Sequence, residues 1–208
     1  MYSRLPSFVL GFHGCDHSFA AAVISGKKEF TPSQNDYDWL GPGSYFWENN
    51  PQRALEFVTH LQGKKRRGKP VIKNPAVIGA VIDLGFCLNL LDSTFLQIVK
   101  EGYQTLKQAL HDAGQPMPVN RPPKDSGEIL LRDLDCAVIN AVHAFRAEQK
   151  LPKFDTVRSA FIEGDELFPG STFREKNHIQ ICVCNPACIK GYFWPIANQD
   201  KEASVAET

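Results

Sequence analysis

The chain lacks several features that would assign it to a class of protein at once. Lysine plus arginine and aspartate plus glutamate both total 23 in 208 residues, so the formal net charge is zero. Strong nonspecific attraction to nucleic acid is therefore not implied. No apolar run approaches the roughly 20 residues that span a bilayer, and no P-loop or Gly-x-Gly-x-x-Gly motif is present. These absences disfavour a membrane protein and the common phosphate-binding loops.

The N-terminus also lacks the pattern of a secretion signal. Residues 1–10 contain an arginine, a proline and an apolar stretch that is too short for a hydrophobic segment plus a cleavage site. We therefore expect a cytoplasmic protein with no membrane contact. In that compartment, the six cysteines indicate reduced thiols more than a disulfide framework.

The segment CVCNPAC, residues 182–188, lacks the second half of a zinc motif. Its spacing is Cys-x-Cys-x3-Cys, and no further Cys-x2-Cys or His-x3-His pair lies nearby. Cys182 and Cys184 would share one face of a strand, because side chains alternate along strands. We expect buried thiols here and no metal, with a zinc site as the alternative. The one dense basic run, residues 63–69, is typical of a solvated loop, with a nucleic-acid contact as its alternative.

Hydrophobic periodicity predicts a single domain of mixed helices and strands. Helices are expected at residues 18–26, 50–63, 92–114 and 132–150, and strands at 7–12, 76–85, 156–164 and 178–185. The irregular spacing of the strands argues against a regular βαβ array and a doubly wound sheet. We predict an α+β domain over residues 1–196, with a helical insertion at about 92–150 and a polar tail at 197–208.

Three short motifs follow one another in a definite order. FHG occupies residues 12–14, LGPGSYF occupies 40–46 before a helix, and QICVCNPACIKGYF occupies 180–193. Together they resemble the poly(ADP-ribose) polymerase-like branch of the ADP-ribosyltransferases. That family has a His-Gly strand, a Gly-x-Gly-x-Tyr-Phe segment and a C-terminal strand with an acidic residue. The resemblance implies central antiparallel split β-sheets with flanking helices, and NAD as a substrate without a metal.

The resemblance also assigns expected roles to individual residues. His13 would hydrogen-bond the adenosine ribose of NAD, and Gly14 would offer its main chain to the nicotinamide amide. Glycine suits that role because a ligand can approach its backbone closely. Tyr45 would stack on the nicotinamide ring, and Phe57 would supply a second aromatic wall. Near Arg53, the family often has a serine that contacts the amide, so that contact is not expected here.

The position that the family usually gives to a glutamate falls on Gln180. A glutamate there would bind the 2′-hydroxyl of the nicotinamide ribose and stabilise the positive charge that develops as the glycosidic bond breaks. An amide keeps the hydrogen bond and loses the charge, which disfavours polymer formation. Single-unit transfer and an inactive enzyme both stay open. We therefore expect His13, Tyr45 and Gln180 to be the catalytic residues.

Further candidates lie in the loops around these motifs. The loop before the third motif would face the acceptor substrate, and its candidate residues are Glu163, Glu166, Glu175 and His178. Ser33 and Asn35 precede the tyrosine motif and would contact the adenosine half of NAD. Arg158 lies in a strand interior, where an unpaired charge is costly. It must be paired or face the cleft, where it would contact the pyrophosphate.

The leading interpretation is a small bacterial or phage mono-ADP-ribosyltransferase, such as a toxin of a toxin–antitoxin or anti-phage system. It would transfer ADP-ribose from NAD to a macromolecular acceptor, either protein or nucleic acid, and an antitoxin protein would be a further partner. The alternatives are a catalytically silent module that binds NAD or ADP-ribose, an NAD glycohydrolase that transfers ADP-ribose to water, and a structural protein without a ligand.

Overall fold

A computed structural model describes residues 8–66, 68–123 and 127–196 of the chain. The tail expected at 197–208 therefore lies outside the described residues. The elements follow one another as β1 (Phe8–Asp16), α1 (His17–Ile24), β2 (Ser44–Glu48), α2 (Pro51–His60), β3 (Pro75–Asp83), β4 (Cys87–Asn89), α3 (Ser93–Asp112), α4 (Asp133–Glu148), β5 (Thr156–Phe161), β6 (His178–Val183), a short 3₁₀ turn (Pro186–Cys188) and β7 (Ile189–Phe193).

Side-chain caps explain where three of the helices begin. The carboxylate of Asp16 accepts the Ser18 N–H at the start of α1, and Asp92 accepts the Thr94 N–H at the start of α3. The side chain of Asn50 accepts the N–H of the residue at the third helical position of α2. These contacts satisfy main-chain donors that a helix leaves without an internal partner.

Within the described residues, the strands form one seven-stranded sheet in the order β4-β5-β6-β2-β1-β3-β7. All neighbours are antiparallel except β4 and β5, which are parallel. The α+β class is confirmed. The expected split into separate sheets is replaced by one mixed sheet, because β2 pairs with β6 on one side and β1 on the other.

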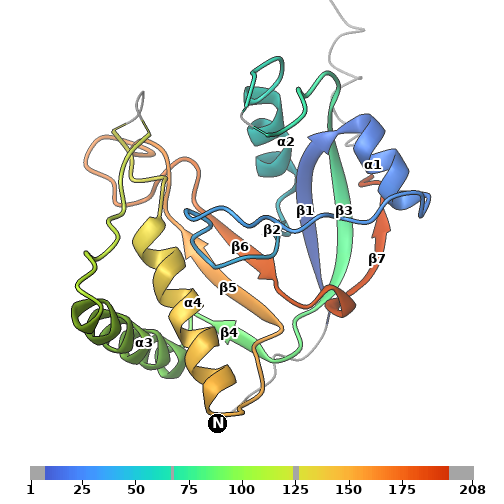
Figure 1. The fold of residues 1–208 in the computed structure, drawn as a ribbon. Coiled ribbons are helices and arrows are strands. Elements are labelled where there is room, and N and C mark those ends of the chain that lie inside the picture. Colours follow the sequence, from blue (N-terminus) through green and yellow to red (C-terminus); the bar gives the residue numbers. More distant parts are fainter. Residues whose placement is uncertain (1–7, 67, 124–126, 197–208) are drawn as a thin grey trace, which may run out of the picture.

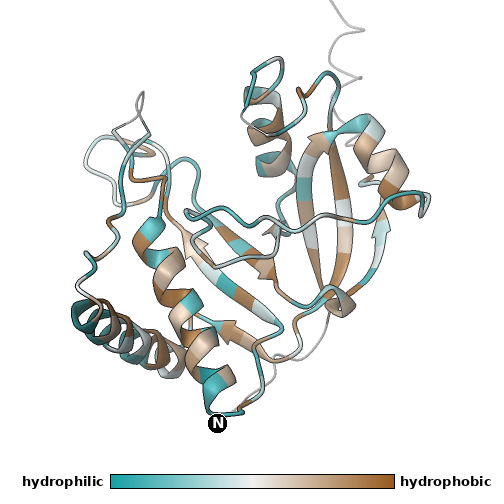
Figure 2. Cartoon of the chain, viewed as in Figure 1, coloured by the Kyte–Doolittle hydropathy of each residue, from teal (hydrophilic) through white to brown (hydrophobic). Residues whose placement is uncertain are grey.

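The helices lie at opposite ends of this sheet, as Figure 1 shows. α3 and α4 pack together beside β4 and β5, whereas α1 and α2 lie against β1 and β3. Figure 2 shows hydrophobic residues concentrated on β1 and β3, and hydrophilic residues along the loop that runs from α1 to β2. No helix among the described residues is long and apolar enough to cross a membrane.

The register divides the side chains of the sheet between two faces, because paired residues point to the same side. We define the site face by Phe12, Tyr45, Trp47, Val157, Gln180 and Cys182, and the rear face by Phe46, Glu48, Ile82, Arg158 and Ile181. α2 and α4 cover the two ends of the site face. A buried hydrophobic cluster that contains Phe46, Ile82 and Ile181 fills the rear face. Two further clusters lie on the site face, one under α4 and one under α2.

Candidate functional site

The three motifs lie on adjacent strands at the centre of the sheet. His13 is on β1, Tyr45 is on the neighbouring β2, and Gln180 is on β6 beyond it. Tyr45 pairs with Cys182, and the next residue of β2 on the same face, Trp47, pairs with Gln180. Tyr45 and Gln180 therefore share the site face although 135 positions of sequence separate them.

The direction of the main chain along β1 follows from its pairing with β2. Phe12 pairs with Trp47, and the N–H of Asn49 donates to the carbonyl of Leu10 at 2.9 Å. In an antiparallel strand, every second residue turns both main-chain groups to the same neighbour. Gly14 therefore turns its N–H and C=O toward β2, two residues beyond the last paired position of this ladder.

A side chain occupies the place of the next rung. The rung after Phe12 would join Gly14 to Tyr45, but Nδ1 of His13 lies 2.8 Å from the Tyr45 carbonyl oxygen instead. The ladder between β1 and β2 ends there, so the two strands diverge with the Gly14 main chain between them. We call this divergence the fork, defined by His13, Gly14 and Tyr45.

The contacts of His13 decide which ring nitrogen can meet a ligand. A carbonyl oxygen only accepts, so Nδ1 carries the proton in this contact and the neutral ring offers Nε2 as an acceptor. The ring lies on the rear face, opposite to Tyr45 and Gln180. There the Phe30 ring is edge-on to it at 4.9 Å between centroids, and the Phe46 ring is at 6.0 Å. Burial lowers the pKa of His13, and the hydrogen bond to Tyr45 opposes this effect. The ring is therefore neutral at physiological pH, as a hydroxyl-binding acceptor requires.

Gly14 has a packing role that its sequence motif did not reveal. A Cβ atom at this position would collide with the Ala54 carbonyl oxygen and lie 2.8 Å from Cβ of Val58, both on α2. The helix thus rests directly on the site-face side of Gly14. A ligand that contacts the Gly14 main chain would approach through the fork.

Tyr45 is held by its hydroxyl group at the far end of the ring. The hydroxyl donates to the Gly41 carbonyl at 2.7 Å and accepts the Leu40 N–H at 3.0 Å. Burial raises the pKa of this phenol far above its usual value. Tyr45 is therefore a neutral ring in a fixed orientation, tied to the Leu-Gly-Pro-Gly part of its own motif.

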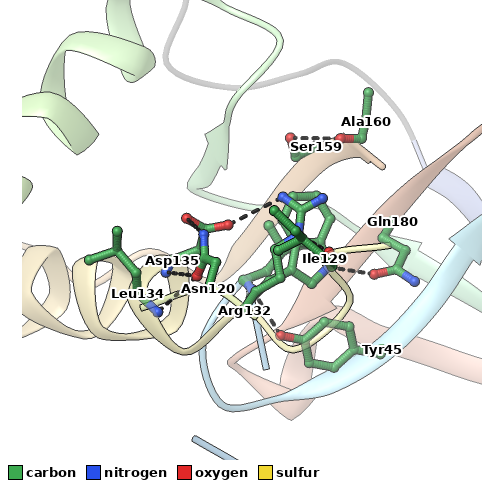
Figure 3. A network of polar contacts seen from close by, with 11 residues as sticks. Tyr45, Asn120, Ile129, Arg132, Leu134, Asp135, Ser159, Ala160 and Gln180 are labelled. Carbon is green, nitrogen blue, oxygen red and sulfur yellow. Dashed lines mark hydrogen bonds and ion pairs between the residues drawn. The ribbon is translucent and has the colours of Figure 1, made fainter. Parts of the chain in front are cut away.

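Gln180 is oriented by an indole group. Nε1 of Trp39 donates to Oε1 of Gln180 at 2.6 Å. Because an indole nitrogen only donates, this contact identifies the Gln180 oxygen and leaves the amide NH₂ for other partners. The Arg132 guanidinium covers the Trp39 ring at 5.4 Å and bonds Asp135 at 3.2 Å. Figure 3 shows this network, in which Tyr45 and Gln180 lie on the sheet and Arg132 and Asp135 lie at the start of α4.

A second polar cluster lies on the site face next to Gln180. The Arg53 guanidinium pairs with Glu163 at 2.8 Å and lies over the Trp47 ring. The rings of Trp47 and His178 are 6.0 Å apart. Nε1 of Trp47, Nε of Arg53 and Nε2 of His178 are buried, and each lacks a hydrogen-bond partner among the described residues. This accumulation is unusual, because most buried polar atoms are paired.

Burial lowers the pKa of His178, and the hydrogen bond between its Nδ1 and the Lys176 carbonyl oxygen, at 2.6 Å, opposes the shift. Nδ1 is thus the protonated nitrogen, and the buried Nε2 is an acceptor. The expected acceptor-loop residues Glu163 and His178 therefore face a common cluster. Glu163 is not an unpaired carboxylate, because Arg53 neutralises it.

Other expected residues lie away from the fork. The Asn35 amide donates to Ser33 Oγ at 2.8 Å and to Asp38, so these side chains brace their own loop. Phe57 is on α2, with its ring 5.1 Å from that of Trp47 and 39% of the residue exposed. It lies on the site face, as an aromatic wall would require.

Arg158 lies on the rear face and is paired. Its Nη2 donates to Oε1 of Glu48 at 2.9 Å, its Nε to Oε2 of Glu48 at 2.5 Å, and its Nη1 to Asn89 at 3.2 Å. The strand separates this guanidinium from Tyr45 and Gln180. Of the two possibilities stated for Arg158, the structure shows the paired one and does not bring the side chain to the site face.

The remaining acceptor-loop candidates are at the surface. Glu166 accepts the Gly170 N–H at 2.9 Å and lies 4.0 Å from Arg174. The Glu175 side chain is exposed. The loop from 163 to 177 thus presents carboxylates to solvent beyond the buried Arg53–Glu163 pair.

Two cavities flank this network. One of about 420 Å³ lies between α3 and α4, and Trp39 forms part of its wall. The other, of about 410 Å³, is lined by Arg132 and Glu163 at the end of β5. Neither is lined by His13 or Tyr45. Among the described residues, no group of three or more His, Cys, Asp or Glu side chains is arranged to hold a metal ion.

Some residues at this site were not expected from the sequence. No role at the site was predicted for Trp39 or Trp47, yet Trp39 orients Gln180 and Trp47 carries a buried indole N–H without a partner among the described residues. Arg132 lies 48 positions before Gln180 and has no motif of its own. The only available signal was that a tryptophan stands directly before and directly after the LGPGSYF motif, residues 40–46.

Comparisons with known proteins do not name a reaction. No protein family matches the chain, and no solved structure matches it. Among curated proteins, the chain is similar to the uncharacterized protein MJ0359 of Methanocaldococcus jannaschii, with 27% identity over 199 residues. The match covers 88% of this chain and 85% of that protein. The similarity therefore extends over most of both chains without stating an activity.

Proposed function

We propose that the chain is a mono-ADP-ribosyltransferase that takes ADP-ribose from NAD and passes it to a macromolecular acceptor. The observation that carries the proposal is the fork. His13 takes the Tyr45 carbonyl that the next rung of the ladder would use, so the Gly14 N–H and C=O are directed between two strands. A planar carboxamide, which offers one donor and one acceptor, complements these two main-chain groups.

The chemistry of the proposed reaction is the cleavage of the bond between nicotinamide and ribose. The ribose gains positive charge as the bond breaks, so orientation and electrostatics supply most of the catalysis. Tyr45 is a fixed neutral ring that would stack on nicotinamide, and Phe57 would form the opposite wall. The His13 ring lies on the rear face, so its Nε2 would accept a hydrogen bond from an adenosine-ribose hydroxyl on the other side of the fork.

Gln180 makes this site less negatively charged than a site with a glutamate at the same position. Its Oε1 receives the Trp39 N–H, so the amide NH₂ is the group that would meet the 2′-hydroxyl of the nicotinamide ribose. This contact orients the ribose and supplies no negative charge. Slow transfer of single units is the expected activity, and growth of a polymer is not expected.

The acceptor would approach the loop from 163 to 177. Glu166 and Glu175 are the surface carboxylates available to polarise an acceptor hydroxyl, amine or guanidinium. The expected setting is an intracellular toxin of a toxin–antitoxin or anti-phage system, held silent by an antitoxin protein. The acceptor is either protein or nucleic acid.

A second function is favoured by one contact. Because Trp39 occupies the Gln180 oxygen and no charge replaces a glutamate, the site could bind NAD or ADP-ribose without turnover. That protein would be a silent binding module. Substitution of Tyr45 by alanine would abolish its binding of NAD or ADP-ribose, and the protein would release no nicotinamide.

The test uses NAD labelled in the adenylate phosphate, incubated with separate pools of cell protein, RNA and DNA. The wild type should label one pool, and Tyr45→Ala should abolish the label. Lys107→Ala, a change of an exposed residue on α3 outside the loop from 163 to 177, is the matched control and should label normally. Gln180→Glu supplies the missing charge and should raise the rate at least about tenfold.

Each of the other possible results would indicate a different function for the chain. Loss of NAD without label in any pool would indicate a glycohydrolase. Binding without loss of NAD, even in Gln180→Glu, would indicate the silent module. Neither binding nor loss of NAD would leave the chain as a structural protein and reject the proposal.

A further inference from the structure

A pair of thiols at the end of β6 stands apart from the other cysteines of the chain. Cys182 lies on the site face and is fully buried, and Cys184, two residues later, lies just beyond the end of β6 and is only partly buried. Cys15, Cys87, Cys136 and Cys188 are buried. The partly exposed thiol of Cys184 therefore has a buried thiol two residues before it in the chain.

Three residues converge on the sulfur of Cys184. The Cys182 thiol and the His143 imidazole of α4 both lie within hydrogen-bond reach of it, and Asp155, before β5, is the nearby acid. The main chain is fixed as well, because the Cys184 N–H donates to the Asp155 carbonyl at 2.9 Å. His143 is held against the Phe154 ring, with centroids 5.9 Å apart.

These neighbours favour the charged form of Cys184. The Cys182 S–H lowers the pKa of Cys184 as a donor to the thiolate, burial raises it, and the His143 imidazole lowers it further; the net shift is downward. Burial raises the pKa of Cys87 and of Cys188 to about 11. Because the thiolate is the reactive form, Cys184 should be the first cysteine to react with an electrophile or oxidant.

We propose that Cys184 and Cys182 form a reversible redox site, in which Cys184 is the peroxide-reactive thiol and Cys182 is the resolving thiol. Two residues along an extended strand span about 6.5 Å. This separation lies at the upper end of the range of Cα distances that a disulfide bridges. The bend that begins at Cys184 allows the remaining adjustment.

The chemistry balances with a hydroperoxide as the oxidant. The Cys184 thiolate attacks the peroxide oxygen, the O–O bond breaks, and Cys184 becomes a sulfenic acid while the leaving alkoxide or hydroxide takes up a proton. The Cys182 thiol then attacks the Cys184 sulfur, an S–S bond forms, and water leaves. Two thiols and one hydroperoxide thus yield one disulfide, one water and one alcohol or second water. A small dithiol reverses the step.

The disulfide would act on the segment that holds Tyr45. The sulfur of Cys182 lies 3.5 Å from the Gly41 carbonyl oxygen, and its S–H donates there when Cys184 is protonated. The same carbonyl also accepts the Tyr45 hydroxyl. Oxidation removes the Cys182 proton and draws its sulfur toward Cys184. One support of the turn at Leu40 and Gly41 is then lost. This consequence follows from the contacts and does not rest on the proposed function.

The test begins with the reduced native chain and one equivalent of hydrogen peroxide, followed by alkylation in denaturant and digestion with trypsin. Cleavage after Lys176 and Lys190 places Cys182, Cys184 and Cys188 in one peptide, residues 177–190. We expect this peptide to lose two hydrogens and to carry one alkyl group, on Cys188. A bond from Cys184 to Cys188, or uniform loss of all six thiols, would overturn the proposal.

Three cysteine variants distinguish the peroxide-reactive thiol from the resolving thiol, and the test does not depend on any single variant folding correctly. Cys182→Ala should stop at a sulfenic acid that dimedone traps on Cys184, and Cys188→Ser, the matched control, should still form the disulfide. Cys184→Ser should consume peroxide at least about tenfold more slowly. Equal consumption by Cys184→Ser would contradict the assignment, and the peptide map of the wild type decides the matter if a variant fails to fold.

The second part of the proposal has its own measurement. Hydrogen exchange in the oxidised wild type should rise at the Leu40 N–H, which donates to the Tyr45 hydroxyl, and should return after treatment with dithiothreitol. The Cys182→Ala variant should show no change on oxidation. Unaltered exchange in a fully oxidised wild type would show that the disulfide does not act on this turn.

Discussion

The two faces of the sheet differ in how far their buried polar side chains are hydrogen-bonded. On the rear face, Arg158 pairs with Glu48 through two hydrogen bonds and with Asn89 through a third. On the site face, Trp47, Arg53 and His178 each keep a buried nitrogen without a partner among the described residues. When every buried polar group has a hydrogen-bond partner, no ligand is needed to satisfy it. Where some groups lack partners, they are available to hydrogen-bond a ligand or water. The contrast separates a structural polar cluster from a candidate functional one.

The largest effect should come from breaking the rear-face pair. The Arg158 and Glu48 side chains are only 14% and 11% exposed, so Arg158→Ala leaves a buried carboxylate without its charge partner. The free energy of unfolding should fall by about 3–5 kcal/mol in urea titrations. Arg174→Ala is the control, because that pair is exposed and 4.0 Å apart, and it should cost less than about 1 kcal/mol. Equal losses in the two variants would mean that burial does not distinguish them.

A smaller effect is expected at the fork. A Cβ at Gly14 would collide with the Ala54 carbonyl oxygen, so Gly14→Ala should displace α2 and lower the free energy of unfolding by about 1–3 kcal/mol. Gly191 is the matched control, because a Cβ there meets no atom within 4 Å. Chemical denaturation of Gly14→Ala and Gly191→Ala provides the comparison. A stable Gly14→Ala protein would show that α2 does not rest on this position.

The hydroxyl and the ring of Tyr45 should have separate effects. Loss of the hydroxyl should lower the free energy of unfolding modestly, and loss of the ring should abolish NAD binding. Tyr45→Phe removes the partner of the Leu40 N–H and should lower the free energy of unfolding by about 1–2 kcal/mol. NAD binding should persist in this variant, because the ring is kept, and should be lost in Tyr45→Ala. If both variants bind NAD alike, the ring is not a wall of the site.

The smallest effect concerns pH on the site face. The pKa of His178 is lowered by burial, so the folded chain binds fewer protons than the unfolded chain just below pH 6.5. Its contribution to stability is therefore present above that pH and is lost as the pH falls toward the folded pKa. Unfolding measured from pH 7 to pH 5 should show a smaller decline in His178→Asn than in the wild type. A steeper decline in the variant would reverse the sign of the assigned shift.

Parts of the fold with strong periodicity were predictable. α3 and α4 lie within two residues of the helices expected at 92–114 and 132–150, because their apolar residues recur at helical spacing. β4 and β7 were not expected. β4 has three residues and β7 has five, and such short segments carry too little pattern to be separated from loops. β2 was visible only as part of a motif.

The site was less predictable than the fold, because its contacts join distant positions. Motif order suggested that His13, Tyr45 and Gln180 belong together. The register places them on three adjacent strands, but the rings of Tyr45 and His13 lie on opposite faces, and only Tyr45 and Gln180 share the site face. Nothing in the sequence indicated that Trp39 would orient Gln180 across 141 positions, or that Glu48 would pair with Arg158 across 110. Such partners depend on strand order, which local spacing does not encode.

The measurement that tests the central claim most directly is a calorimetric titration of the purified chain with NAD. The fork predicts that the wild type binds one NAD per chain. Tyr45→Ala should weaken that binding at least about tenfold, or about 1.4 kcal/mol, whereas Phe168→Ala, an exposed residue in the loop from 163 to 177, should leave it unchanged. A wild type that takes up no NAD, or equal affinity in Tyr45→Ala, would contradict a nicotinamide site at the fork.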